Sequence, residues 1–407
     1  MPNMLDYLDW RGDVPFNVAP FNEVDNAILA QLSYLDLDGI ISTVEEGGSI
    51  SVREMAQKYA DLGRTNEVNS YEGVVSPLTH FLPEKMANGR RFREARLSKL
   101  RSTLDHDSQE QFFAFHVSLP NRTTYISFRG TDNTLLGWRE NFAMTYMTAA
   151  AQREALSYVN QTCNMLNTPF SKIMLGGHSK GANLAMYAGA LAKPSIQRRI
   201  VKIWDNDGPG FTEDVLSRET LNAIRPKIFT ILPAFDVVGQ LLYAPLPNKI
   251  IQSSEKGIYQ HSGLSWQVDK CAFVPATTQE IEEGAAPIVE TFESWFKSAS
   301  NEKRRAVFTE FFDMLDRANI TTLSELLSTD PTVIRKIAAE IPATSKETRD
   351  YVMDFFGRLM SNVATSKAQD LQNKVTAAVQ AAGEAAREVA GNAMKVTQDV
   401  IKQVIEN

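Results

Sequence analysis

The sequence has few of the residues from which disulfide frameworks and metal centres are built. Its 407 residues include 2 cysteines and 5 histidines. Two cysteines, Cys163 and Cys271, are too few for a disulfide framework or a zinc ribbon, and both are expected to be reduced. The histidines form no HExxH, HxH or HxxxH pattern. We therefore expect no catalytic metal.

An excess of basic residues and a long apolar run are also missing. Lys and Arg total 42 against 49 Asp and Glu, a net charge of −7, which argues against nucleic-acid binding. No stretch reaches the roughly 18 apolar residues of a membrane-spanning helix. The opening MPNMLDYLDWRGD carries acids where a signal peptide has a basic and then an apolar segment. We expect a cytoplasmic protein with no transmembrane segment and no nucleic-acid partner.

Between residues 111 and 240, strand-like runs alternate with helical patterns. The runs FFAFHVSL and TTYISFRGT flank Pro120-Asn121-Arg122 and predict a hairpin with a buried second strand. One helix is expected over residues 138–160. KIMLGGHSKGANLAMYAGALA then gives a strand, a glycine turn and a small-residue helix, and IVKIWDNDGPG and KIFTILPAFDVVG repeat the strand-then-loop pattern. This alternation predicts an α/β fold with a mostly parallel central sheet and extra C-terminal helices.

The chain beyond Thr277 is expected to be helical. We divide the sequence into a domain over 1–300, a helical extension packed on it over 301–360, and an Ala-rich amphipathic tail over 361–407. Small apolar residues recur in the tail at steps near 3.5, which favours docking to a protein partner or self-association over a disordered tail or a membrane anchor. The extension carries a stripe of aromatic and apolar residues at helical spacing, namely Phe308, Phe311, Phe312, Met314 and Leu315. Its two interpretations are a lid over an acyl pocket and packing within a core, and we prefer core packing.

The strongest chemical signal is the pentapeptide Gly177-His178-Ser179-Lys180-Gly181. This G-x-S-x-G lies between a predicted strand over 173–175 and a predicted helix over 182–191. A serine at such a turn adopts strained dihedrals, and Gly177 and Gly181 avoid clashes around it. The turn also opens a helix, so the Lys180 backbone N–H can donate to an oxyanion. We interpret Ser179 as a nucleophile rather than part of a chance glycine-rich turn.

A nucleophilic serine needs a base and an acid, which in hydrolases of this type follow in the order Ser, Asp or Glu, His. Only His261 follows Ser179, and it is the expected base. Asp236 follows a strand before the histidine loop and is the favoured acid. Asp205 and Asp207 follow the preceding strand and are close rivals, although capping of the next turn is the more ordinary role for them.

FRGT at 128–131, GWRENF, GGHSKGANLA, the DVVG turn and the late histidine together resemble the class 3 lipase group of α/β-hydrolases. The segments LDYLDWRGDVPF and NEVDNAILAQLSYLD resemble more closely a bacterial family of uncharacterised lipase-like proteins. The likeness covers roughly residues 3–330. It implies an α/β-hydrolase (lipase-like) domain over 1–300 and makes Thr131 an oxyanion residue through its backbone N–H and, as a further candidate donor, its hydroxyl. Arg129 is expected to be structural. Lys180 replaces the usual leucine, which leaves its backbone donor in place but changes the acyl pocket.

These residues predict a serine hydrolase that cleaves a carboxylic ester through an acyl-enzyme. Ser179 attacks, His261 transfers the proton, Asp236 orients His261, and the Thr131 and Lys180 amides bind the oxyanion. Water accepts the acyl group, so no cofactor is expected. The resemblance suggests an acyl ester or lipid as substrate. Acyl transfer or thioester cleavage by the same triad, and a non-catalytic partner-binding module of the same fold, remain as alternatives.

Overall fold

A computed structural model describes most of the chain, at residues 2–66, 76–105, 110–132, 134–166, 168, 170–282, 285, 289, 299–326, 330–340 and 343–350. The chain divides into two compact units, 1–356 and 357–407, and all described residues belong to the first. The predicted tail over 361–407 lies outside the described residues. Among the described helices, none combines the length and the apolar character needed to cross a membrane.

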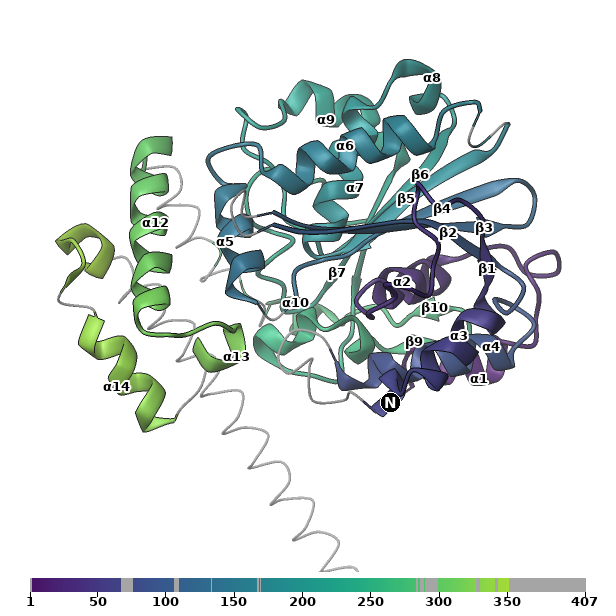
Figure 1. Cartoon of the computed structure of the whole chain (residues 1–407), viewed down its shortest axis with the longest axis horizontal. Coiled ribbons are helices and arrows are strands. Elements are labelled where there is room, and N and C mark those ends of the chain that lie inside the picture. Colours follow the sequence, from purple (N-terminus) through teal and green to yellow (C-terminus); the bar gives the residue numbers. More distant parts are fainter. Residues whose placement is uncertain are drawn as a thin grey trace, which may run out of the picture. The chain divides into compact units, whose positions relative to one another are not determined.

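The centre of the fold is a mixed sheet whose strands follow one another in sequence order (Figure 1). Strands β1 to β4 pair antiparallel, whereas β4 to β8 run parallel. The predicted hairpin is confirmed as β3 and β4, and the α/β fold with a mostly parallel sheet is confirmed as well. The strands in the described residues are β1 Ile50–Ser51, β2 Arg96–Asp105, β3 Glu110–Leu119, β4 Thr123–Phe128, β5 Lys172–His178, β6 Ile200–Asn206, β7 Ile228–Pro233 and β8 Lys249–Ile251.

The order of the parallel strands fixes which helices cover which face. Right-handed crossovers between parallel strands laid down in sequence order place every connecting helix on the same face. Accordingly α6 Ala150–Thr162, α7 Lys180–Leu191 and α9 Arg218–Ile224 share one face and one apolar core (Figure 1). The opposite face packs against α1 Met4–Arg11, α2 Glu23–Leu32, α3 Val52–Asp61, α4 Leu82–Asn88 and the small sheet of β9 Val268–Asp269 and β10 Ala272–Phe273.

The single helix expected over 138–160 was wrong, because two helices occupy this stretch. They are α5 Leu135–Ala143 and α6. Ala149 precedes α6 and has no side-chain oxygen with which to cap it. The Glu140 carboxylate of α5 accepts from the Ala151 N–H at 2.8 Å instead, and a negative charge at a helix N-terminus is stabilising. The break therefore brings α5 side-on to the start of α6.

The described C-terminal helices are α12 Asn301–Arg317, α13 Leu323–Leu326 and α14 Pro331–Glu340. Figure 1 shows α5 between the sheet and α12. Phe142 of α5 packs against Phe308 of α12 with ring centroids 4.5 Å apart. The aromatic stripe of α12 is buried in a core cluster shared with α5, so its residues pack as core in the structure and do not form an exposed lid.

Candidate active site

Ser179 occupies a strained turn between β5 and α7. Its φ of 58° and ψ of −129° lie in a region that side-chain-bearing residues rarely adopt. The serine stands at the N-cap position of α7, yet its side chain makes no capping hydrogen bond. Its backbone N–H instead donates to Asn206 O on the neighbouring strand at 3.0 Å. The hydroxyl is therefore not used by the helix and remains available for chemistry.

The two glycines of the pentapeptide are required because the surrounding backbone leaves no room for a Cβ atom. A Cβ on Gly177 would lie 2.3 Å from the carbonyl carbon of Gly181, and a Cβ on Gly181 would lie 2.2 Å from Phe128 O. Gly130, in the loop after β4, is equally restricted, since a Cβ there would come within 2.5 Å of His178 O. The turn, the helix start and the β4 loop thus meet backbone to backbone.

His261 ends the short helix η5 Gly257–His261 and contacts the carboxylate of Asp207. Its Nδ1 lies 2.6 Å from Asp207 Oδ2. With Nδ1–H donating to the carboxylate, Nε2 carries the free lone pair, and this atom is buried without a hydrogen-bond partner among the described residues. Burial lowers the pKa of His261 to about 4, so its imidazole is neutral at pH 7 and able to accept a proton.

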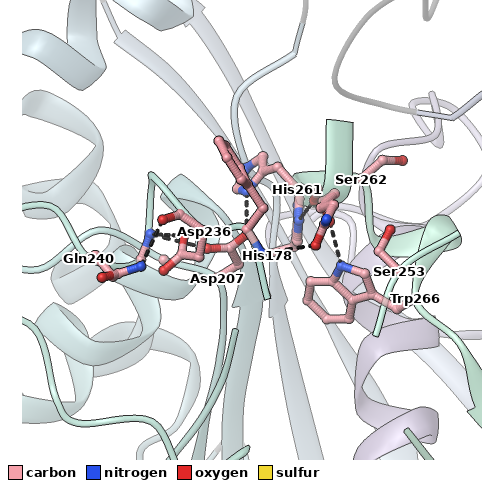
Figure 2. A network of polar contacts seen from close by, with 12 residues as sticks. His178, Asp207, Asp236, Gln240, Ser253, His261, Ser262 and Trp266 are labelled. Carbon is pink, nitrogen blue, oxygen red and sulfur yellow. Dashed lines mark hydrogen bonds and ion pairs between the residues drawn. The ribbon is translucent and has the colours of Figure 1, made fainter. Parts of the chain in front are cut away.

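The expected contact between His261 and Asp236 is not the one in the structure. Asp207 follows β6, which pairs directly with the β5 strand that carries Ser179, whereas Asp236 follows β7, one strand further away. His261 reaches the nearer carboxylate. Asp236 lies beside Asp207, and its Oδ1 accepts from the Gly239 N–H at 2.8 Å (Figure 2).

Asp205 caps the turn that follows β6, which is the ordinary role expected for it from the sequence. Its Oδ1 accepts from the Gly208 N–H at 3.0 Å, and its Oδ2 accepts from the Thr230 hydroxyl at 2.8 Å. Burial raises the pKa of Asp205 from 3.8 to about 7, with a smaller contribution from the charge of Asp236. Asp207 instead contacts His261 and accepts from the Gly239 N–H at 3.1 Å, so the two neighbouring acids have different partners.

The loop that carries His261 is held by donors to two consecutive carbonyl groups (Figure 2). His178 Nε2 donates to His261 O at 2.7 Å, and Trp266 Nε1 donates to Gln260 O at 2.9 Å. His178 Nδ1 in turn accepts from the Tyr34 hydroxyl at 2.7 Å. Burial, and to a smaller extent the nearby His261, hold the pKa of His178 well below its usual range. His178 is therefore a neutral link between the Ser179 turn and the His261 loop.

Lys180 directly follows Ser179, and Thr131 lies in the loop after β4. Neither backbone N–H donates to another described residue. The Thr131 hydroxyl is already committed, since it donates to Asn141 Oδ1 at 2.8 Å. The Lys180 ammonium is buried and contacts Glu140 Oε2 at 2.8 Å and Gln111 O at 2.9 Å. The Thr131 side chain thus contacts α5, and the Lys180 side chain contacts α5 and β3. Their two backbone N–H groups are the donors that remain to bind an oxyanion.

Several residues of the site were missed by sequence reasoning. Glu140 and Asn141 stand in the quoted GWRENF segment, but no role was assigned to them. A lysine inside an otherwise small-residue helix was the available signal, because a buried ammonium requires an acidic or carbonyl partner. Tyr34 gave no comparable signal: its link to His178 spans 144 residues. Arg129, expected to be structural, donates to the carbonyl groups of Ser33 and Leu35.

The described residues hold no group of three or more His, Cys, Asp or Glu side chains placed to bind a metal ion.

Comparison with known proteins gives one family. No curated protein and no solved structure matches the chain significantly. The model of the Mbeg1-like family, a lipase-like family, matches residues 86–313, which include Thr131, Ser179, Asp207, Asp236 and His261. Because this match spans 228 of the 407 residues, the chain belongs to the Mbeg1-like family.

Proposed function

We propose that this protein is a serine hydrolase that cleaves carboxylic esters through an acyl-enzyme intermediate. The observation that carries the proposal is the strained Ser179, whose hydroxyl does not cap α7, together with the buried His261, whose Nε2 has no hydrogen-bond partner among the described residues and whose Nδ1 contacts a carboxylate. The ring centroid of His178, the residue before Ser179, lies 4.6 Å from that of His261. Backbone strain of this kind costs about 1–3 kcal/mol and is kept mainly where it serves function.

In the acylation step, Ser179 Oγ bonds to the ester carbonyl carbon while its proton passes to His261 Nε2. The Asp207 carboxylate holds the tautomer with Nδ1–H and stabilises the imidazolium that forms. The carbonyl oxygen becomes an oxyanion that accepts from the Thr131 and Lys180 backbone N–H groups. Collapse breaks the bond to the alkoxy group, which leaves as an alcohol with the proton from His261.

In the deacylation step, water replaces the alcohol. His261 Nε2 takes a proton from the water as its oxygen attacks the acyl carbon, and the same two amides hold the second oxyanion. Collapse breaks the bond to Ser179 Oγ, which regains a proton from His261. The products are a carboxylic acid and free enzyme, and no cofactor is consumed.

Membership of a lipase-like family supports an acyl ester or lipid as the substrate class. The same triad would serve an acyltransferase or a thioesterase, which differ only in the acceptor or the leaving group. No specific observation favours these, or a non-catalytic partner-binding module, over ester hydrolysis.

Labelling with a fluorophosphonate probe and peptide mass mapping tests the nucleophile. We expect rapid labelling confined to Ser179, and none in Ser179→Ala. Ser33→Ala is the matched control: Ser33 is a buried serine in ordinary helical conformation, and its removal should leave labelling of Ser179 unchanged. Folded wild-type protein that does not react would favour the binding-module alternative.

Hydrolysis of nitrophenyl esters of increasing acyl length tests the reaction and its substrate class. We expect turnover that depends on Ser179 and varies with chain length. Asp207→Asn should lower kcat by about 10²- to 10⁴-fold, because an amide at this position selects the wrong tautomer of His261. A normal rate in this variant would remove Asp207 from the role of orienting acid.

A further inference from the structure

Asp207 and Asp236 form a pair of buried carboxyl groups that share one hydrogen-bond donor. The Gly239 N–H lies 3.1 Å from Asp207 Oδ1 and 2.8 Å from Asp236 Oδ1. A Cβ on Gly239 would meet Asp207 Oδ1 at 2.9 Å and Asp236 Oδ2 at 3.1 Å. Side chains that follow two neighbouring strands therefore converge on the Gly239 N–H, and Figure 2 shows Asp207 and Asp236 close to each other.

The pair lacks a cation strong enough to balance two negative charges. Among the described residues, Asp207 has an ion-pair contact with His261 alone, and Asp236 has none. Asp236 Oδ2 is buried without a hydrogen-bond partner. Two unit charges about 4 Å apart repel by about 4 kcal/mol at an effective dielectric constant of 20, and burial adds a further cost. One of the two groups therefore keeps a proton.

The contacts identify which carboxyl group keeps it. Asp207 accepts from two N–H donors, His261 Nδ1 and Gly239, whereas Asp236 only shares the second. Donors stabilise the charged form of the group that accepts from them. Burial, together with the charge of Asp207, raises the pKa of Asp236 well above its usual range. Burial raises the pKa of Asp207 to about 7, and the charge of Asp205, at the end of β6, adds to the rise, whereas hydrogen bonds from Asp236 and from the Gly239 N–H lower it. The nearby His261 lowers the pKa of Asp236.

We propose that Asp236 is a positioning residue whose protonated Oδ2 donates a hydrogen bond to the Asp207 carboxylate and keeps it ionised and directed at His261. This inference rests on the proposed function. The proton explains why Asp236 Oδ2 has no donor of its own, because it is itself the donor. Asp236 acts through Asp207 and touches neither substrate nor Ser179.

The pH profile of kcat/KM tests this role, because a purely structural residue would not change its shape. Wild-type activity should fall at high pH as Asp236 loses its proton and repels Asp207. In Asp236→Asn the amide keeps an N–H donor but cannot titrate. We expect this variant to stay within about threefold of wild type at pH 7.5 and to lose the alkaline fall.

Asp236→Leu removes the donor and should lower kcat by about 10- to 100-fold with a smaller change in KM. Asp205→Asn is the matched control: it removes a carboxyl group from the same buried region, but one that caps a turn, and the alkaline fall should remain. The folded state of each variant is checked by thermal unfolding.

An infrared difference spectrum tests the proton without relying on catalysis. At pH 7.5, the wild-type spectrum minus that of Asp236→Asn should contain the carbonyl band of a protonated carboxylic acid. Absence of that band overturns the inference whether or not the protein hydrolyses esters.

Two kinetic outcomes also overturn it. If Asp236→Asn is as inactive as Asp207→Asn, Asp236 is the ionised acid. If Asp236→Leu is as active as wild type, Asp236 has no role in positioning Asp207. Failure of wild-type Ser179 to react with the fluorophosphonate would instead refute the proposed function, and the positioning role would fall with it.

Discussion

At the scale of single residues, the site depends on backbone conformations that most side chains avoid. Ser179 has φ 58° and Asp207 has φ 55°, and each directly follows a strand of the same parallel pair. Residues at the carboxyl ends of adjacent parallel strands lie side by side, so two unusual turns at the same edge bring a hydroxyl and a carboxylate into one site.

The strain at Ser179 has a measurable cost. Ser179→Gly and Ser179→Ala both remove the hydroxyl, but only glycine adopts the observed φ without a Cβ penalty. We expect Ser179→Gly to exceed Ser179→Ala in free energy of unfolding by about 1 kcal/mol, once the greater chain entropy of glycine is subtracted. Urea unfolding measures the difference. At Ser33, with φ −66°, the order of the Gly and Ala variants should reverse. Equal stability of the two Ser179 variants would mean that the turn stores no strain.

Asp205 makes stability depend on pH. Its pKa is raised from 3.8 to about 7 by burial, so the folded protein holds a proton that the unfolded chain has released. Stability is therefore lost as the pH rises from about 4 to 7. Asp205→Asn keeps an acceptor for the Gly208 N–H, and its amide N–H can donate to the Thr230 hydroxyl oxygen in place of the bond that Asp205 Oδ2 accepts from that hydroxyl. It should be more stable than wild type by on the order of 1–3 kcal/mol at pH 8, with no gain near pH 4.

Chemical unfolding at several pH values gives this difference. The exposed Asp61 supplies a control, since Asp61→Asn should alter stability little at any pH. A difference for Asp205→Asn that stays constant between pH 4 and pH 8 would show that Asp205 does not hold its proton in the fold.

The sequence was sufficient to identify the nucleophile candidate and insufficient to identify the carboxylate that contacts His261. The glycine spacing around Ser179 is a local requirement, so a pentapeptide reveals it. The choice between Asp207 and Asp236 depends on which strand lies next to β5 and on where the loop before His261 returns. These are long-range properties, and the hydrogen bond from His261 to Asp207 spans 54 residues.

At the scale of elements, α5 is the helix that contacts the side chains of both proposed oxyanion residues. Its consecutive residues Glu140 and Asn141 bind the side chains of Lys180 and Thr131. Because successive helical residues point about 100° apart, one short helix reaches two different neighbours. Across the break that separates α5 from α6, which sequence patterning did not reveal, the same Glu140 carboxylate also accepts from the Ala151 N–H.

The buried pair of Glu140 and Lys180 should show strong energetic coupling. Either Glu140→Gln or Lys180→Met leaves a buried charge without its partner and should cost about 3–5 kcal/mol. The double variant should cost clearly less than the sum of the two, because no unpaired charge remains. A double-mutant cycle from urea unfolding measures the coupling.

Arg139 offers a control within the same helix. It pairs with Asp313 and Asp316, whose side chains are 48% and 63% exposed. Arg139→Met should therefore change stability by less than about 1 kcal/mol. Additive effects of the Glu140 and Lys180 substitutions would mean that the buried pair contributes no coupling.

At the scale of the whole molecule, the candidate site draws on segments from Tyr34 to His261, all within the first compact unit. Deleting residues 361–407 should therefore leave kcat/KM for a short, soluble ester within about twofold of the full-length value. Parallel assays of the two chains at equal concentration check this. A large loss would show that the deleted segment contributes to the site.

The fold class was predictable at this scale because strand and helix patterns alternate along the chain. The order of the strands and the packing of α12 on α5 were not, since a pattern of apolar residues shows that a face is buried but not against what. Phe312 is one example: helical spacing marked its burial, and only the structure gives α5 as its neighbour.

The sequence order of the strands also has a consequence for how the protein is made. Each strand pairs with the one synthesised just before it, so a chain growing on the ribosome can add β5 to a sheet that is already started. Ser179 then reaches its turn while the segment that carries His261 is still to be translated. A nascent chain would accordingly form the turn of the proposed nucleophile first and receive the proposed base last, so under the proposed function it would have no hydrolase activity until synthesis has passed residue 261.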